Sequence, residues 1–149
     1  SYGLHFDLSS NTSRSSFGLF TVGDSARSET TRYKKQADSV DRPVEVYRLP
    51  RGYEISKVCV GDNATCAGPG VGSTAACYNS STDNRFLDIV FIRPNPEPHV
   101  CIYPSAVHPD DCVNSTPFSA RAIVCVKASR VGLERMIEIN KGGQIRINK

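Results

Sequence analysis

Apolar and polar residues alternate along much of the chain with the two-residue period of half-buried β-strands. At the amino end Tyr2, Leu4, Phe6 and Leu8 alternate with smaller or polar residues, which places all four on one face of a strand. Runs rich in β-branched and aromatic residues predict further strands at Phe17 to Val22, Val44 to Leu49, Tyr53 to Val60, Arg85 to Arg93, Val100 to Tyr103, Ala120 to Ala128, Met136 to Asn140 and Gln144 to Asn148. The Arg85 to Arg93 run is apolar almost throughout, which indicates a strand covered on both faces.

The tripeptide Pro50-Arg51-Gly52 predicts a hairpin between two of these strands. A proline that opens a type I turn and a glycine in the left-handed position fit the three-residue loop of a bulged hairpin. The resulting register sets Leu49 opposite Tyr53, Tyr47 opposite Ile55 and Arg48 opposite Glu54.

A second three-residue loop, Lys141-Gly142-Gly143, predicts a hairpin at the carboxyl end. This loop length pairs Ile139 with Ile145, Ile137 with Ile147 and Glu138 with Arg146. A two-residue Gly-Gly turn would instead set Ile139 against Arg146, so we favour the longer loop. We expect the four isoleucines to pack on the core and Glu138 and Arg146 to form an exposed ion pair.

Two segments are predicted to be rich in loops. Residues 24–43 form either a loop or a short helix around Ser28 to Ala37, and their basic stretch Arg27 to Lys35 is a solvated connection or a patch for an acidic partner or lipid headgroup. Residues 62–84 are rich in Gly, Ala, Ser, Thr and Asn and look like a long loop tied by disulfides. The expected fold is a single domain over residues 1–149, mainly β and possibly α+β. Its basis is an antiparallel sheet or sandwich.

Six cysteines indicate three disulfides. Three of them, Cys59, Cys101 and Cys125, lie between β-branched residues on predicted strands, and the other three, Cys66, Cys77 and Cys112, lie in predicted loops. Six cysteines allow fifteen connectivities; we expect Cys66 with Cys77, Cys101 with Cys112, and Cys59 with Cys125. Disulfides persist in oxidising compartments, so a secreted, extracellular protein is expected.

Four Asn-x-Ser/Thr sequons agree with a secretory route. They begin at Asn11, Asn63, Asn79 and Asn114, each in a polar stretch where a glycan acceptor has to lie. The first residues lack the basic start and apolar core of a signal peptide, so we expect the mature form of a secreted chain. No stretch approaches the roughly 20 apolar residues of a membrane span.

The sequence contains no recognisable catalytic, metal or cofactor motif. Eighteen basic and 15 acidic side chains give a net charge of +3, too balanced to predict nucleic-acid binding. No Cys-x-x-Cys pair indicates zinc, and His108-Pro109-Asp110-Asp111 is more typical of a polar turn than of a cation site. His5, His99 and His108 lack a second group at a recognisable spacing, so we predict no catalytic residue.

An alternative ribonuclease-type site would combine His99, near Glu97, with Glu54 and Arg48. A serine-hydrolase motif is absent, and an even cysteine count leaves no spare thiol as a nucleophile.

The profile as a whole resembles the small secreted cysteine-rich effector and avirulence proteins of plant-colonising fungi. One structural family among them carries a Trp-Arg-hydrophobic-basic motif, and the nearest counterpart here is Tyr47-Arg48-Leu49-Pro50. The resemblance implies a secreted, non-enzymatic virulence effector that engages a host protein or receptor, and it assigns no functional residue. Two alternatives stay open: a small secreted ribonuclease-type enzyme or toxin, and a protease inhibitor presenting a loop held between Cys66 and Cys77. The partner and the oligomeric state are left open.

Overall fold

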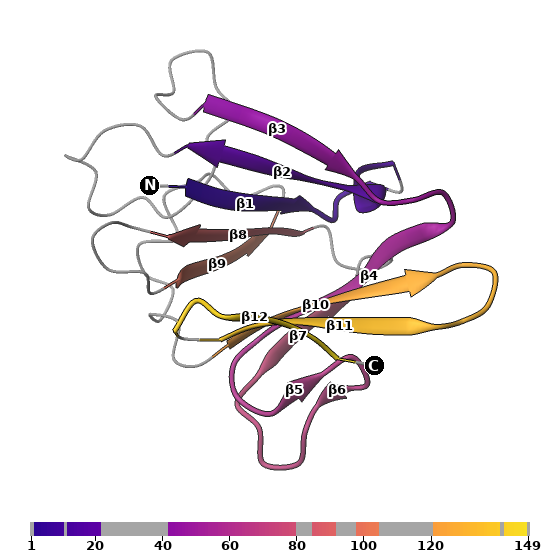
Figure 1. The fold of residues 1–149 in the computed structure, drawn as a ribbon. Helices are drawn as coiled ribbons and strands as arrows, with labels where there is room; N and C mark the ends of the chain where they lie inside the picture. The colour runs from indigo at the N-terminus through magenta and orange to yellow at the C-terminus, as the bar shows by residue number, and fades with distance from the viewer. Residues whose placement is uncertain are drawn as a thin grey trace.

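Two five-stranded antiparallel sheets form a β-sandwich (Figure 1). The computed structural model describes residues 2–10, 12–21, 42–79, 85–91, 98–104, 121–140 and 142–148. Within these ranges there is no α-helix, and a short 3-10 turn, η1 (Ser13–Ser15), precedes the second strand. The fold therefore confirms the prediction of a mainly β, antiparallel domain stapled by disulfides.

Sheet A has the strand order β3-β2-β1-β8-β9, and sheet B has the order β12-β11-β10-β4-β7. The strands of sheet A are β1 (Tyr2–Asp7), β2 (Ser16–Thr21), β3 (Arg42–Arg48), β8 (Arg85–Phe91) and β9 (Pro98–Pro104). Those of sheet B are β4 (Tyr53–Val60), β7 (Ala76–Asn79), β10 (Arg121–Ala128), β11 (Glu134–Asn140) and β12 (Ile145–Asn148). A small hairpin of β5 (Ala64–Thr65) and β6 (Gly68–Pro69) lies outside both sheets.

The main core lies between the two sheets. Phe6, Leu87 and Ile89 contribute from sheet A, and Ile55 and Val124 contribute from sheet B. All five are at most 6% exposed, and burial of one such side chain contributes about 1.5–3 kcal/mol. The predicted strands at these positions are confirmed because their alternating apolar residues form this core.

Strand β8 is buried on both faces, as its apolar run predicted. Leu87 and Ile89 point into the core, while Asp88 and Val90 alternate onto the outer face of sheet A and are also fully buried. The predicted apolar run therefore contains one fully buried carboxyl side chain, that of Asp88.

The predicted hairpin around Pro50-Arg51-Gly52 is wrong. Strand β3 pairs with β2, and β4 pairs with β10 and β7, so the chain crosses from sheet A to sheet B at this turn. The N–H of Tyr53 donates to the carbonyl of Pro50 (3.0 Å), and Gly52 has φ +88°. This is the geometry of a type II turn, which needs a residue that accepts positive φ at its third position. The left-handed conformation predicted for Gly52 is confirmed. The predicted type I turn is replaced by a type II turn, and the flanking strands find partners elsewhere in the sequence.

The predicted loop at 62–84 contains more regular structure than expected. It folds back as the β5–β6 hairpin and then supplies β7, which pairs with β4. Residues 80–84 lie outside the described ranges, as does the predicted helix or loop up to residue 41.

Candidate interaction surface at the open edge of the sandwich

The carboxyl-terminal hairpin has the predicted register. Strands β11 and β12 pair Ile139 with Ile145, Ile137 with Ile147 and Glu138 with Arg146. The N–H of Asn140 donates to the carbonyl of Gln144 (3.0 Å), and Gly143 takes φ +73°. A three-residue loop that ends in a left-handed glycine matches the twist of the strands that it joins.

The predicted burial of this hairpin is wrong for β12. Ile139 is 2% exposed, but Ile145 and Ile147 are 57% and 72% exposed. Because β12 is the terminal strand of its sheet, the core reaches β11 and stops short of β12.

The expected ion pair is also replaced. The carboxylate of Glu138 lies 3.4 Å from Arg121 and accepts a hydrogen bond from the Asn148 side-chain amide (3.2 Å), and it is part-buried rather than exposed. The register had paired Glu138 with Arg146 by position, but Arg121 lies on the neighbouring strand β10 and reaches the same carboxylate.

Strand β3 is the matching terminal strand of sheet A. Its Tyr47 stacks on Phe17 with ring centroids 5.2 Å apart, and Phe17 stacks on Phe6 at 5.6 Å. A hydrogen bond to the Glu45 side chain, followed by desolvation and the Glu45 charge, raises the pKa of Tyr47. The aromatic row thus runs from the core out to an exposed phenol at the edge.

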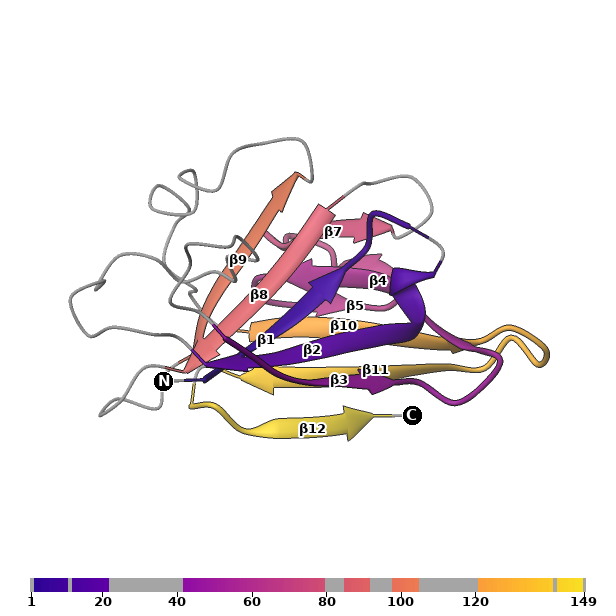
Figure 2. The same ribbon diagram turned by 90° about the horizontal axis from the view of Figure 1, so that it is seen from above.

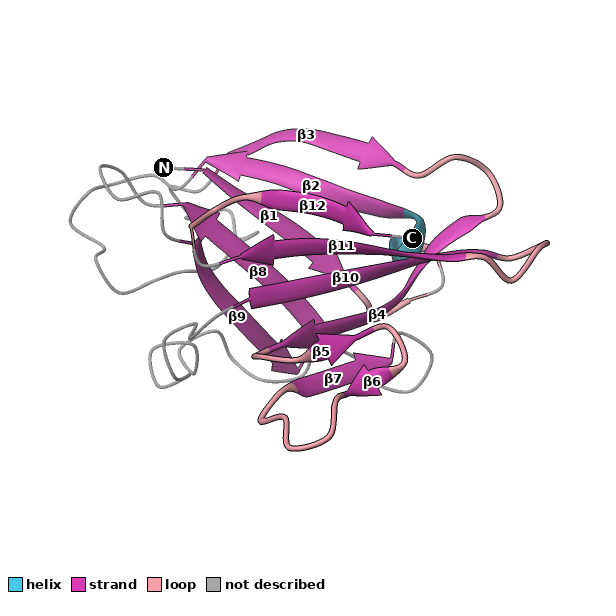
Figure 3. Ribbon diagram, turned by 60° about the horizontal axis from the view of Figure 1, so that its bottom comes forward, coloured by secondary structure: helices cyan, strands magenta, loops and turns pink. Residues whose placement is uncertain are grey.

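Figure 2 shows that β3 and β12 lie along the same side of the sandwich, one at the edge of each sheet, and Figure 3 shows the same arrangement from below. In the described part of the chain each pairs with a single neighbour. We call their exposed apolar side chains the open edge: Val44, Val46 and Tyr47 on β3, and Ile145 and Ile147 on β12, all between 40% and 72% exposed. Natural proteins usually protect such edges with charge, proline or a covering segment.

Two predicted glycan acceptors lie away from the open edge. Asn79 is exposed at the end of β7, which is the terminal strand on the other side of sheet B, and Asn63 is exposed in the turn before β5. Asn11 and Asn114 lie outside the described residues. Glycans at Asn63 and Asn79 would leave the β12 side of sheet B uncovered.

The predicted disulfide pairing is wrong. Cys59 pairs with Cys77, and Cys66 pairs with Cys125; the expected Cys66–Cys77 and Cys59–Cys125 bridges do not form. Cys59 and Cys77 are direct neighbours on β4 and β7, with Cα atoms 4.1 Å apart. No described cysteine is free, and the expected Cys101–Cys112 pair includes Cys112, which lies outside the described residues.

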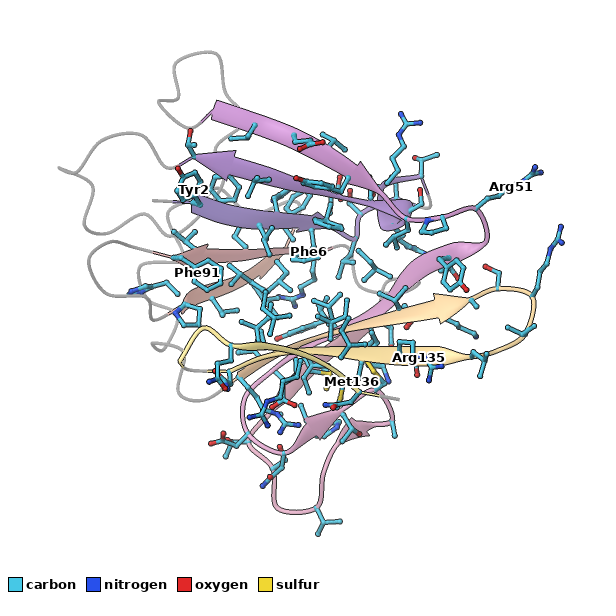
Figure 4. The ribbon with its side chains drawn as sticks, viewed as in Figure 1. Tyr2, Phe6, Arg51, Phe91, Arg135 and Met136 are labelled. Carbon is cyan, nitrogen blue, oxygen red and sulfur yellow. A yellow bond between two sulfur atoms is a disulfide. The ribbon has the colours of Figure 1, made fainter. Side chains whose placement is uncertain are left out.

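These disulfides fasten a second, smaller core to the outer face of sheet B. Cys59, Cys125, Ile123 and Ala64 are fully buried there, and Met136 packs against them. Figure 4 shows Phe6 between the sheets and Met136 on the opposite side of sheet B, beside the disulfides. The loop expected to present residues between Cys66 and Cys77 is therefore not closed on itself, which removes the feature that favoured a protease inhibitor.

His5 has a partner that its local sequence did not reveal. Its Nδ1 lies 2.6 Å from the Asp88 carboxylate, which is fully buried. The two residues are direct cross-strand neighbours on β1 and β8, and the Phe86 ring packs 5.4 Å from the imidazole. A histidine held by a buried carboxylate is a common orienting pair in hydrolases. The local sequence did not reveal this pair, because His5 and Asp88 lie 83 positions apart and meet only where β1 pairs with β8.

The ribonuclease-type constellation is dispersed over the two sheets. Arg48 lies on β3 opposite Ser16, Glu54 lies on β4 opposite Lys127, and His99 is exposed on β9 opposite Val90. Glu97 and His108 lie outside the described residues.

One group among the described residues has the spacing of metal ligands: Cys66, Cys125 and Glu134. Their two sulfur atoms are joined in a disulfide, so they offer no thiolate to a metal. Glu134 instead accepts a hydrogen bond of 2.5 Å from the Ser56 hydroxyl.

Among the described residues, none forms a helix of the length and apolar character needed to cross a bilayer. The disulfides are compatible with an oxidising, extracellular setting.

Comparison with known proteins found no matching family model, no matching curated protein and no matching solved structure.

Proposed function

We propose that this chain is a secreted, non-enzymatic interaction protein, a virulence effector that engages a host protein through the open edge. The observation that carries the proposal is the set of five exposed apolar side chains on two terminal strands of one sandwich side. The two disulfides support an extracellular site of action.

A terminal strand offers a partner two kinds of contact. Its outward backbone N–H and C=O groups pair with an added strand, and its alternating side chains determine which strand fits. Here Val46 and Tyr47 on β3 and Ile147 on β12 would be covered by such a partner. Exposed apolar surface of this kind marks interaction sites in soluble proteins.

Binding to proteins of plant apoplastic fluid tests the proposal. The immobilised full chain is compared with Val46→Lys and Ile147→Lys, which place a charge on each terminal strand. Val71→Lys is the matched control because Val71 is fully exposed in a loop outside both sheets. We expect one identified host protein to bind the wild type and the control, and to bind each edge variant roughly tenfold or more weakly.

A host protein that binds all four chains equally would rule out the open edge as the docking surface. All three substitutions lie on exposed side chains, so each should keep unfolding stability within about 0.5 kcal/mol of the wild type. Thermal melts of the four chains verify that a variant that no longer binds the host protein is still folded.

A small secreted enzyme of the ribonuclease type is the second candidate, favoured by the hydrogen-bonded His5 and Asp88. The buried carboxylate would orient the imidazole as a general base. Incubation of the full chain with single-stranded RNA tests this function. Cleavage that is lost in His5→Ala and retained in His99→Ala supports it, and an absence of cleavage by the wild type contradicts it.

A further inference from the structure

Two turns meet at one end of the sandwich, beyond the point where the chain crosses between the sheets. They are the β3–β4 corner, which carries Arg51 and Tyr53, and the β10–β11 turn, which carries Arg130, Val131 and Leu133. The N–H of Ser129 donates to the carbonyl of Gly52 (2.8 Å), which joins the two turns. Both lie at the right-hand end of the molecule in Figure 1, and Figure 4 shows Arg51 projecting there into solvent.

The β10–β11 turn is fixed and presents apolar side chains. The N–H of Ala128 donates to the carbonyl of Leu133 (2.8 Å), and Gly132 adopts φ +65° between the two aliphatic residues. Val131 is 67% exposed and Leu133 is 57% exposed. We call Arg51, Tyr53, Arg130, Val131, Leu133 and Arg135 the basic tip.

The charge exposed at the basic tip is positive. Its three arginines are all exposed. The carboxylates on the adjoining strand ends are half-buried: Glu134 accepts the Ser56 hydroxyl, and Glu54 is the cross-strand neighbour of Lys127. The tip therefore combines protruding aliphatic groups with cations around them.

We propose that the basic tip docks on the surface of an anionic phospholipid bilayer. Val131 and Leu133 would enter the interface between headgroups and acyl chains, while the arginines contact lipid phosphates and carboxylates. Tyr53, 44% exposed on the flank, has an apolar ring and a polar hydroxyl that suit the same boundary. Charge complementarity and the convex shape of two turn ends favour a lipid surface over a flat protein partner. The site shares no side chain with the open edge.

Co-sedimentation with vesicles tests the proposal on the full chain. We expect binding to vesicles of equimolar phosphatidylcholine and phosphatidylserine, and at least roughly tenfold weaker binding to phosphatidylcholine alone. The double variants Val131→Ser with Leu133→Ser, and Arg51→Gln with Arg130→Gln, should each lower the partition coefficient roughly tenfold or more. Val71→Ser is the control, because it removes an equally exposed aliphatic group from another loop.

The proposal is overturned if the wild type does not bind the equimolar vesicles, or if the serine double variant binds them as well as the wild type does. Loss of binding in Val71→Ser would also overturn it. A tip that docks on a protein instead would give tip variants that lose a protein partner while no chain binds vesicles. Val46→Lys should bind vesicles like the wild type, which separates this result from a failure of the open edge. The substituted residues are exposed, so matching thermal melts confirm that the variants are folded.

Discussion

Gly3 occupies a position on β1 that has no room for a side chain. A methyl group there would lie 2.6 Å from Cε1 and 2.8 Å from Cε2 of the Phe20 ring, and closer still to Cζ. Phe20 is its cross-strand neighbour on β2 and is 1% exposed. The ring is therefore packed across the glycine, and it cannot swing aside into solvent.

Gly3→Ala should consequently destabilise the protein by about 1–3 kcal/mol, the usual effect of overpacking. Gly18→Ala is the matched control on the same sheet, because the nearest atom to its added methyl group would be His5 Cβ at 3.9 Å. Urea unfolding of both variants gives the comparison. Equal midpoints would show that Phe20 relaxes without cost.

The phenol of Tyr47 should titrate at a lower pH once Glu45 is removed. The Glu45 hydrogen bond is the largest cause of its raised pKa, and the negative charge adds to the effect. In Glu45→Ala we expect the Tyr47 pKa to fall, measured by NMR titration of ring-labelled tyrosine. Glu45→Gln keeps an acceptor without the charge and should give an intermediate value. A Tyr47 pKa that is the same in all three chains would contradict this assignment.

The buried Asp88 shows what a residue-level reading of the sequence could not supply. Its neighbours Leu87 and Ile89 correctly predicted a strand covered on both faces. A carboxyl group in such a strand needs a partner, and that partner, His5, lies near the amino end of the chain, 83 positions away. No local spacing indicates a pair formed by two strands this distant in sequence.

The β11–β12 hairpin gives the sharpest test of how burial is divided within one element. Ile139→Ala should cost about 2–5 kcal/mol, because Ile139 is 2% exposed in the main core. Ile147→Ala, on the same face of the hairpin but 72% exposed, should change stability by less than about 0.5 kcal/mol. Denaturant midpoints of the two variants measure the difference. A large cost at Ile147 would mean that β12 is covered in solution.

Strands were predictable from the sequence, whereas several of their partners were not. Alternating apolar residues defined β1 because burial of one face imposes that period. A continuous apolar run defined β10. The β11–β12 register followed from a three-residue loop because its strands have no other described partner on that side. The hairpin predicted from the similar loop at Pro50-Arg51-Gly52 is wrong because β4 finds a longer antiparallel partner in β10. The open edge was not predicted, because a register shows which residues share one face of a hairpin. It does not show how far the opposite sheet extends to cover that face.

The two described disulfides should contribute unequally to the stability of the whole molecule. Cys66 and Cys125 close a loop of 59 positions, and Cys59 and Cys77 close one of 18. The chain-entropy relation assigns about 4 kcal/mol to the first and about 3 kcal/mol to the second. Removing Cys66 and Cys125 together should thus lower stability by about 1 kcal/mol more than removing Cys59 and Cys77 together.

Alanine is the suitable replacement in both pairs, because Cys59 and Cys125 are fully buried. Reversible chemical unfolding of the two double variants provides the free energies. A larger loss for the Cys59–Cys77 pair would show that packing in the second core, rather than loop closure, determines the contribution of these bridges.

The connectivity of these bridges has a consequence for how the chain matures. Cys66 lies inside the loop closed by Cys59 and Cys77, and Cys77 lies inside the loop closed by Cys66 and Cys125. Cys66 and Cys77 lie only eleven positions apart, although they do not form a native pair. Short loops close readily. That bridge consumes one sulfur from each native pair.

A newly made chain that joins Cys66 to Cys77 first can therefore complete neither final bridge until a thiolate attacks this disulfide and reshuffles it. Such reshuffling takes seconds to hours and depends on the isomerase that is present. The yield of mature protein should therefore depend on the thiol–disulfide exchange capacity of the compartment in which the chain folds.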